Sequence, residues 1–212
     1  MTPEDLSERW LISLRQAKET LKHTTQRIVR SATMPLARRY RADHMYEKQQ
    51  LRGEWFPDTL DGRVTSKDGN SYGQVFANRG YLATIYPMDT KGKAGDALRT
   101  FCLEFGVPEK LTCDGSKEQT GKKTELIKQV RRNDIELHVI EPDWYNQNPC
   151  EGVIRKVRRK WFCTMIRGRV PRKFWDYGMR WVCKVMQRIL AQAVGLGGHT
   201  PIESVTGDGR YI

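Results

Sequence analysis

The 212-residue sequence predicts an α/β fold, a mixed five-stranded sheet flanked by helices, preceded by a small helical unit. Two patterns predict this class. The first three strand candidates follow one another with only turns between them, which indicates antiparallel pairing. The later strands alternate with helices, which indicates parallel pairing through crossover connections. We expect a helical unit with a basic connector at residues 1–50, the core at 51–194 and an extended, weakly ordered tail at 195–212.

Two short helices are predicted ahead of the sheet. Thr2 offers a capping hydroxyl, with proline and acidic residues in the turn that follows. Ser13 caps a second helix, with Gln16 at the capping-box position. Two short helices with a tight link resemble a helix-turn-helix, although small helical bundles show the same pattern. The candidate DNA-binding side chains of the second helix are Arg15, Lys18 and Lys22.

The sheet is predicted from short apolar runs bounded by turn residues, including the hairpin signal Asp68-Gly69. In chain order the predicted elements are strands at 54–60, 73–77 and 81–86, a helix at 92–105, a strand at 110–114, a helix at 122–132 and a strand at 135–140.

Two long helices complete the predicted core. Pro149 suits the first turn of one helix, and a last amphipathic helix covers residues 171–194. The apolar side of the first helix is formed by Val153, Ile154, Val157 and Trp161.

A carboxylate and an arginine row share another face of the helix that begins at Pro149. Glu151 and Arg155 are four residues apart, and Arg158 or Arg159 continues the row. A carboxylate beside arginines suggests a metal site next to bound phosphate. The alternative is a solvated helix face with an ordinary ion pair.

The net charge of +12 is unevenly distributed. The excess of cations over anions is +4 in residues 1–50, −1 in 51–145, +10 in 146–188 and −1 in 189–212. A near-neutral segment followed by a strongly basic helical one is typical of a nucleic-acid binder.

Several classes of protein are not expected. No apolar run reaches the length of a membrane span and the N-terminus has no signal-peptide core, so we expect a soluble intracellular protein without a membrane partner. Five cysteines without a C-x-x-C pair indicate free thiols in a reducing compartment. Four scattered histidines lack cysteine partners at zinc-finger spacing, so no zinc is predicted.

Three carboxylates fall at the ends of predicted elements. Asp58 lies on the first strand, Asp114 ends the fourth, and Glu151 opens the helix after the fifth. If the first and fourth strands are neighbours, the two aspartates meet, and the helix can place its glutamate across them. Oxygen-only ligands suit Mg²⁺ or Mn²⁺, which support in-line phosphodiester displacement.

At this point the sequence resembles the integrases of long-terminal-repeat retrotransposons, most closely the copia type, within the ribonuclease-H-like superfamily. Thirty-six residues separate Asp114 from Glu151, close to that family's spacing of thirty-five, and the resemblance covers roughly residues 54–206. The motifs that carry it are residues 105–115 (FGVPEKLTCDG), 142–152 (PDWYNQNPCEG), 175–177 (WDY) and 200–203 (TPIE).

The resemblance implies an enzyme that trims DNA 3′ ends and joins them to target DNA without a covalent enzyme intermediate. It implies that Asp58, Asp114 and Glu151 are the metal ligands. It also implies a homo-oligomer, a dimer or tetramer, acting on double-stranded DNA in the nucleus, with cytoplasmic particles before nuclear entry as an open alternative. The residues expected to hold the element's DNA end are Arg155, Lys156, Arg158 and Arg159.

The sequence departs from the family in three places. A helical unit replaces the usual His/Cys zinc module, Pro149-Cys150 stands where a glycine-bearing loop is common, and the basic C-terminal region is missing. These departures leave open a polyprotein fragment, or a decayed or domesticated DNA-binding module of the same fold. A ribonuclease or exonuclease would use the same acids, but the arginine row favours an integrase.

Two aspartates compete for the role of first ligand. Fifty-two residues separate Asp61 from Asp114 and fifty-five separate Asp58, and the shorter spacing is nearer to retroviral integrases. Residues three apart on a strand point to opposite faces, so only one can reach the metal. Asp61 precedes Gly62, a pair that favours a turn in which the carboxylate binds local backbone. We therefore expect Asp58 to be the ligand.

Overall fold

A computed structural model describes residues 1–23, 50–80, 82–115, 121, 124–140, 149–189 and 199–206. It confirms the predicted fold class, a five-stranded sheet in the order β3-β2-β1-β4-β5. β1 pairs antiparallel with β2, and β2 with β3, whereas β4 pairs parallel with both β1 and β5. The strands are β1 (Gln50–Asp61), β2 (Tyr72–Asn78), β3 (Ala83–Met88), β4 (Val107–Cys113) and β5 (Glu136–Val139).

β1 is longer than predicted because it continues across a bulge. Its register against β4 shifts between Leu51 and Glu54, and Gly53 has φ +85°. Glycine adopts this left-handed conformation without a steric penalty, which explains its presence at the bulge. Residues 50–53 therefore add to the strand that the sequence pattern began at residue 54.

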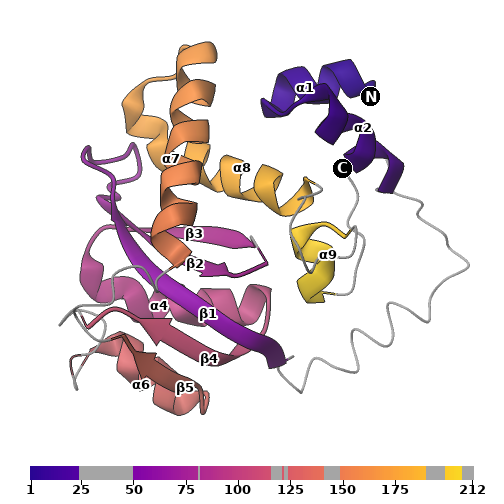
Figure 1. The fold of residues 1–212 in the computed structure, drawn as a ribbon. Helices are drawn as coiled ribbons and strands as arrows, with labels where there is room; N and C mark the ends of the chain where they lie inside the picture. The colour runs from indigo at the N-terminus through magenta and orange to yellow at the C-terminus, as the bar shows by residue number, and fades with distance from the viewer. Residues whose placement is uncertain are drawn as a thin grey trace, which may run out of the picture.

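Helices cover both faces of the sheet (Figure 1). On one face, α4 (Ala94–Glu104) and α6 (Glu125–Arg132) pack over a core that contains Trp55, Phe76 and Phe101. On the other face, α7 (Pro149–Arg167) and α8 (Trp175–Arg188) pack over Phe56 and Leu60. Alternation along β1 sends odd-numbered residues to the first core and even-numbered residues to the second. Short 3₁₀ turns, η2 (Lys91–Lys93) and η4 (Arg172–Phe174), precede α4 and α8.

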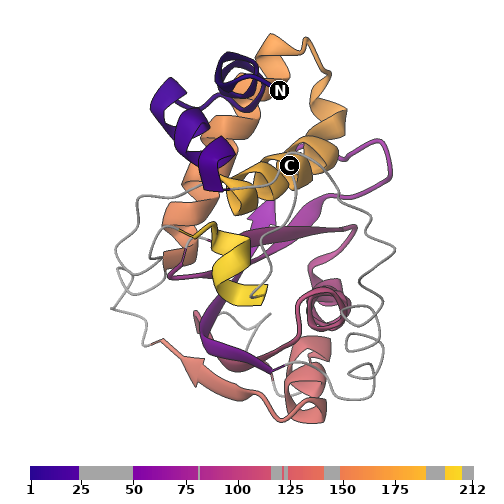
Figure 2. The same cartoon turned by 90° about the vertical axis from the view of Figure 1, so that its right-hand side faces the viewer.

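The N-terminal helices α1 (Pro3–Trp10) and α2 (Leu14–His23) confirm the predicted pair, and Thr2 forms the expected capping box with Asp5. Their apolar residues Leu6 and Ala17 form a third cluster with Val185 and Ile189 at the end of α8. The two helices are therefore docked beside α8 (Figure 2). Arg167 reinforces the contact by donating to the backbone carbonyl and the carboxylate of Glu8.

Several predicted boundaries are wrong, including those of α6, α8 and the tail. Thr124 is extended and caps α6, so the helix starts at Glu125 and not at residue 122. Ile189 is extended and ends α8 before residue 194. The tail predicted as extended contains α9 (Pro201–Thr206), whose Ile202 is buried in the same core cluster as Trp55 and Phe101.

Parts of the sequence prediction lie outside the described residues: most of the connector (24–49), the polar loop at 141–148 and much of the tail. The domain boundaries themselves stay a prediction. No helix in the described ranges is long and apolar enough to cross a membrane.

Candidate active site

Neighbouring parallel strands bring the two aspartates together. Trp55 of β1 is paired with Leu111 of β4. Three residues further along each strand, the same register places Asp58 opposite Asp114, which directly follows β4. Asp58 lies between Phe56 and Leu60 on the face covered by α7.

The first turn of α7 brings the third carboxylate to the same edge. Cys150 is fully buried in the core between α7 and the sheet, whereas the next residue, Glu151, is exposed. Burial raises the pKa of the Cys150 thiol well above its usual value, and the Asp58 carboxylate raises it further. Cys150 therefore anchors the helix beside Asp58 and leaves Glu151 at the rim.

The three acids influence one another electrostatically. The pKa of Asp58 is raised from 3.8 to about 6, first by burial and then by the carboxylates of Asp114 and Glu151. The backbone N–H of Thr59, 2.7 Å from Asp58 Oδ1, and the guanidinium of Arg158 oppose this rise. A partly buried carboxylate beside two others is a site of concentrated negative charge, where a cation is favoured.

This raised pKa predicts a pH-dependent cost in stability. The folded state binds the Asp58 proton more tightly than the unfolded state. The stability that this proton contributes is therefore lost as pH rises from about 4 to about 6. In metal-free buffer, Asp58→Asn should raise the free energy of unfolding by on the order of 1–3 kcal/mol at pH 7.5. The gain should be smaller at pH 5 by on the order of 1 kcal/mol. Urea unfolding of both proteins at the two pH values checks this. A gain at pH 7.5 that is no larger than the gain at pH 5, or a loss of stability at pH 7.5, would contradict it.

Glu151 is paired with a neighbour on its own helix. Its Oε1 accepts from Arg155 Nη2 at 3.1 Å, and both side chains are exposed. Within the described ranges, no three side chains of histidine, cysteine, aspartate or glutamate form a ready-made metal site. The donor chemistry nevertheless suits a hard divalent cation, because all three candidate ligands are carboxylates. An exposed ion pair contributes only about 0–1 kcal/mol, so Glu151 can leave Arg155 at little cost.

Asp61 is engaged in a turn. Its Oδ1 accepts from the backbone N–H of Arg63 at 2.7 Å, and the side chain is exposed at the end of β1. This is the local backbone contact that the Asp61-Gly62 sequence predicts.

The cations of α7 differ in their surroundings. Arg158 is partly buried, lowers the pKa of Asp58 and donates from Nη2 to the Asp61 carbonyl at 3.3 Å. Of the two arginines that could continue the row, Arg158 is thus the one that contacts the acidic edge. Lys156 and Arg159 are exposed, as are Arg15, Lys18 and Lys22 on α2. DNA binding by these residues stays a prediction.

Two residues of the site were not singled out from the sequence. Cys150 extends the apolar stripe of α7 by one turn, so helical periodicity could have found it. The backbone N–H of Thr59 has no sequence signal, because its role depends on the conformation of β1.

The sequence matches no protein-family model and no curated protein. Solved structures do share its fold. A chain of the simian T-cell lymphotropic virus intasome, solved in complex with PP2A regulatory subunit B56 gamma, superposes with a TM-score of 0.55 at 10% identity. That match covers 76% of this chain and 60% of the viral chain, so this chain spans about three fifths of its length.

The HTLV-2 integrase catalytic core domain, solved in complex with magnesium in a trimeric form, gives a TM-score of 0.53 at 9% identity. This match covers 74% of the chain and 99% of the viral domain. At such identities the likeness shows the fold alone. The core of this chain has the ribonuclease-H-like fold of retroviral integrase catalytic cores.

Proposed function

We propose that this protein is an integrase of the kind encoded by long-terminal-repeat retrotransposons, of the copia type. It would process the 3′ ends of element DNA and join them to target DNA by phosphodiester transesterification. The observation that carries the proposal is that Asp58, Asp114 and Glu151 lie along one edge of this fold, near enough for the latter two to raise the pKa of the first.

Divalent-cation chemistry fits the three carboxylates. Asp58, Asp114 and Glu151 would hold Mg²⁺ or Mn²⁺ through oxygen atoms alone. When bound, such ions activate an attacking hydroxyl and stabilise the leaving oxygen in an in-line displacement.

The chain's own residues prepare this edge for DNA. A DNA phosphate near α7 competes with Glu151 for the guanidinium of Arg155, and breaking that exposed pair leaves the carboxylate free to turn toward the two aspartates. Arg158 remains beside Asp58 and offsets part of the negative charge there. DNA binding and assembly of the acidic cluster would thus support each other.

Replacing both Arg155 and Arg158 with alanine should weaken DNA binding and flatten its salt dependence by about one to two units of slope, because each phosphate contact releases counterions. Fluorescence anisotropy with duplex DNA over a range of salt concentrations measures this. Arg52→Ala with Arg131→Ala, two exposed cations outside α7, is the control with the same loss of charge. A slope that falls equally in both pairs would mean that the arginine row has no particular role.

The same proposal implies which molecules the protein binds and where in the cell it acts. Element ends and target DNA are the double-stranded substrates, a dimer or tetramer brings two ends together, and the nucleus is where the target lies. The basic segment at 146–188, with its excess of ten positive charges, supports nucleic acid as the partner.

A DNA-binding module without turnover is the second candidate, because the Arg155–Glu151 pair keeps one candidate ligand engaged. Incubating the protein and Mg²⁺ or Mn²⁺ with a duplex bearing the terminal repeats that flank its gene distinguishes the two. An integrase shortens the 3′ ends and gives longer, joined products on a denaturing gel. A binding module retards the duplex in a native gel and leaves its strands intact.

A further inference from the structure

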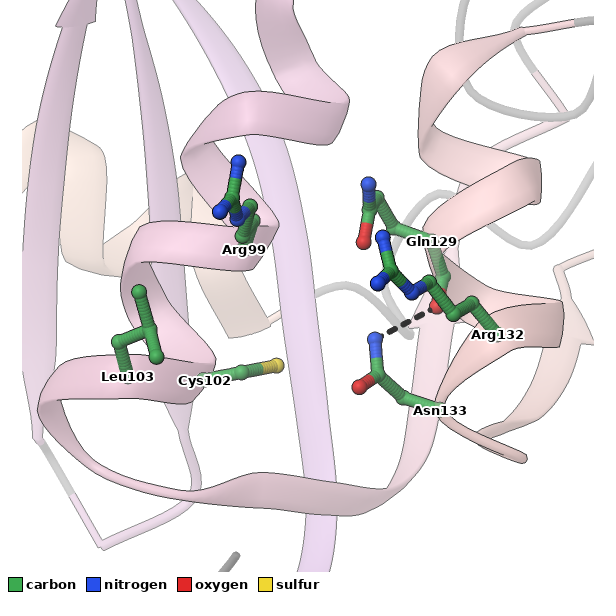
Figure 3. A pocket seen from close by; sticks show the side chains of 6 residues that line it. All are labelled: Arg99, Cys102, Leu103, Gln129, Arg132 and Asn133. Carbon is green, nitrogen blue, oxygen red and sulfur yellow. Dashed lines mark hydrogen bonds between the residues drawn. The ribbon is translucent and has the colours of Figure 1, made fainter.

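A hollow lies between α4 and α6 (Figure 3), two helices that cover the face of the sheet opposite α7 (Figure 1). Its volume is about 210 Å³. None of the described residues that line it is acidic, so this lining is cationic or neutral. The lining residues are Arg99, Cys102, Leu103, Gln129, Arg132 and Asn133.

Two guanidinium groups dominate this hollow. Arg99 projects from the middle of α4 and Arg132 from the last turn of α6, on opposite sides of the gap in Figure 3. Among the described residues, neither side chain has a carboxylate partner or a hydrogen-bond acceptor. Attraction to the helix C-terminus explains the position of Arg132 but not that of Arg99. Both side chains are exposed, so they are free to turn toward an anion that enters the hollow between them.

The remaining walls limit what could bind. Asn133 Nδ2 donates to the Gln129 carbonyl at 2.8 Å, which holds the asparagine side chain across the end of α6. Buried Cys102 lies beside the two arginines in the lining. The volume corresponds to about seven water molecules. This is room for one compact oxyanion with a few waters, and too little for an attached nucleobase.

We propose that Arg99 and Arg132 form a phosphate-binding site, separate from the carboxylate edge. Guanidinium groups match the tetrahedral oxygens of phosphate through paired N–H donors, and two of them neutralise a dianion. The phosphate is either a free ion or one group of a nucleic-acid backbone, since both present the same oxygens.

Inorganic phosphate is the first probe, added to the full chain in magnesium-free buffer at constant ionic strength. At ten times the dissociation constant, mass action should raise Tm by about 3–5 °C. Arg99→Gln with Arg132→Gln should abolish this shift, and either change alone should weaken phosphate binding at least about ten-fold. Arg131→Gln, an exposed arginine in the same last turn of α6 that does not line the hollow, should keep the full shift.

Duplex DNA then identifies the source of the phosphate. If the site takes a backbone phosphate, the double variant lowers the salt slope of DNA binding by about one or two units. If it takes free phosphate, that slope is unchanged while the Tm shift is lost. The proposal is overturned if phosphate does not raise Tm of the wild type, or if the double variant retains the shift. The single variants keep the test decisive should the double variant fold poorly.

Discussion

Replacing Asp114 with asparagine is expected to reduce magnesium-dependent strand transfer at least about 10³-fold while the DNA dissociation constant stays within about two-fold of wild type. The change removes an oxygen anion from the acidic edge and leaves every cation of α7 in place. Glu151→Gln should have the same effect, and it also breaks the pair with Arg155. A gel assay for joined products and an anisotropy assay for binding measure the two quantities.

Asp134→Asn is the matched control for this experiment. Asp134 is an exposed aspartate after α6 with φ +52°, a conformation that asparagine tolerates. It should retain full joining. Strand transfer by the Asp114 variant at more than a tenth of the wild-type rate would remove that residue from the mechanism.

A second large loss of joining activity is expected for only one of two aspartates that lie three residues apart on β1. Asp58→Asn should eliminate joining, whereas Asp61→Asn should retain most of it. Asp58 lies under α7 and is raised in pKa by Asp114 and Glu151, while Asp61 accepts from the backbone of Arg63 in a turn. Asparagine keeps a side-chain oxygen that can accept from the Arg63 N–H, so Asp61→Asn should change stability and activity little.

Stability provides an independent check on the same pair. Asp58→Asn should be more stable than wild type at pH 7.5 and inactive, the opposing changes expected when a charge is kept for function at the expense of stability. Asp61→Asn should be about as stable as wild type and active. If the Asp61 variant is the inactive one, the first ligand is wrongly assigned. The register of β1 would then have to shift by an odd number of residues, so that Asp61 faces α7.

The sequence predicted the sheet well because its signals are local. Turn residues separate the first three strands, and alternation with helices marks the last two as parallel. Once β1 and β4 are neighbours, the positions of Asp58 and Asp114 follow from strand register alone. The position of Glu151 follows from the apolar stripe of α7, because this stripe determines which side of the helix packs on the sheet.

Features that depend on distant contacts were not predictable in the same way. Gly53 interrupts the apolar pattern, so the strand that crosses it through a bulge looked shorter. Ile202 is buried only because the residues of α4 and its neighbours provide a core for it. The docking of α1 and α2 on Val185 and Ile189 likewise needs the end of α8. The pairing of Glu151 with Arg155 was weighed from spacing, but only the side-chain geometry shows it.

Mn²⁺ binding tests the central claim most directly, because it needs no knowledge of the cognate DNA ends. The electron paramagnetic resonance signal of free Mn²⁺ decreases when the ion binds to the protein, so a titration at pH 7.5 counts bound ions. Each protein is titrated with duplex DNA, and the Mn²⁺ taken up by the same duplex alone is subtracted. Wild type and Asp61→Asn should then bind one or two Mn²⁺ ions per chain, and Asp58→Asn and Asp114→Asn should bind none at the same concentrations. Equal uptake by wild type and the Asp114 variant would contradict the assignment of this carboxylate edge as a metal-dependent active site.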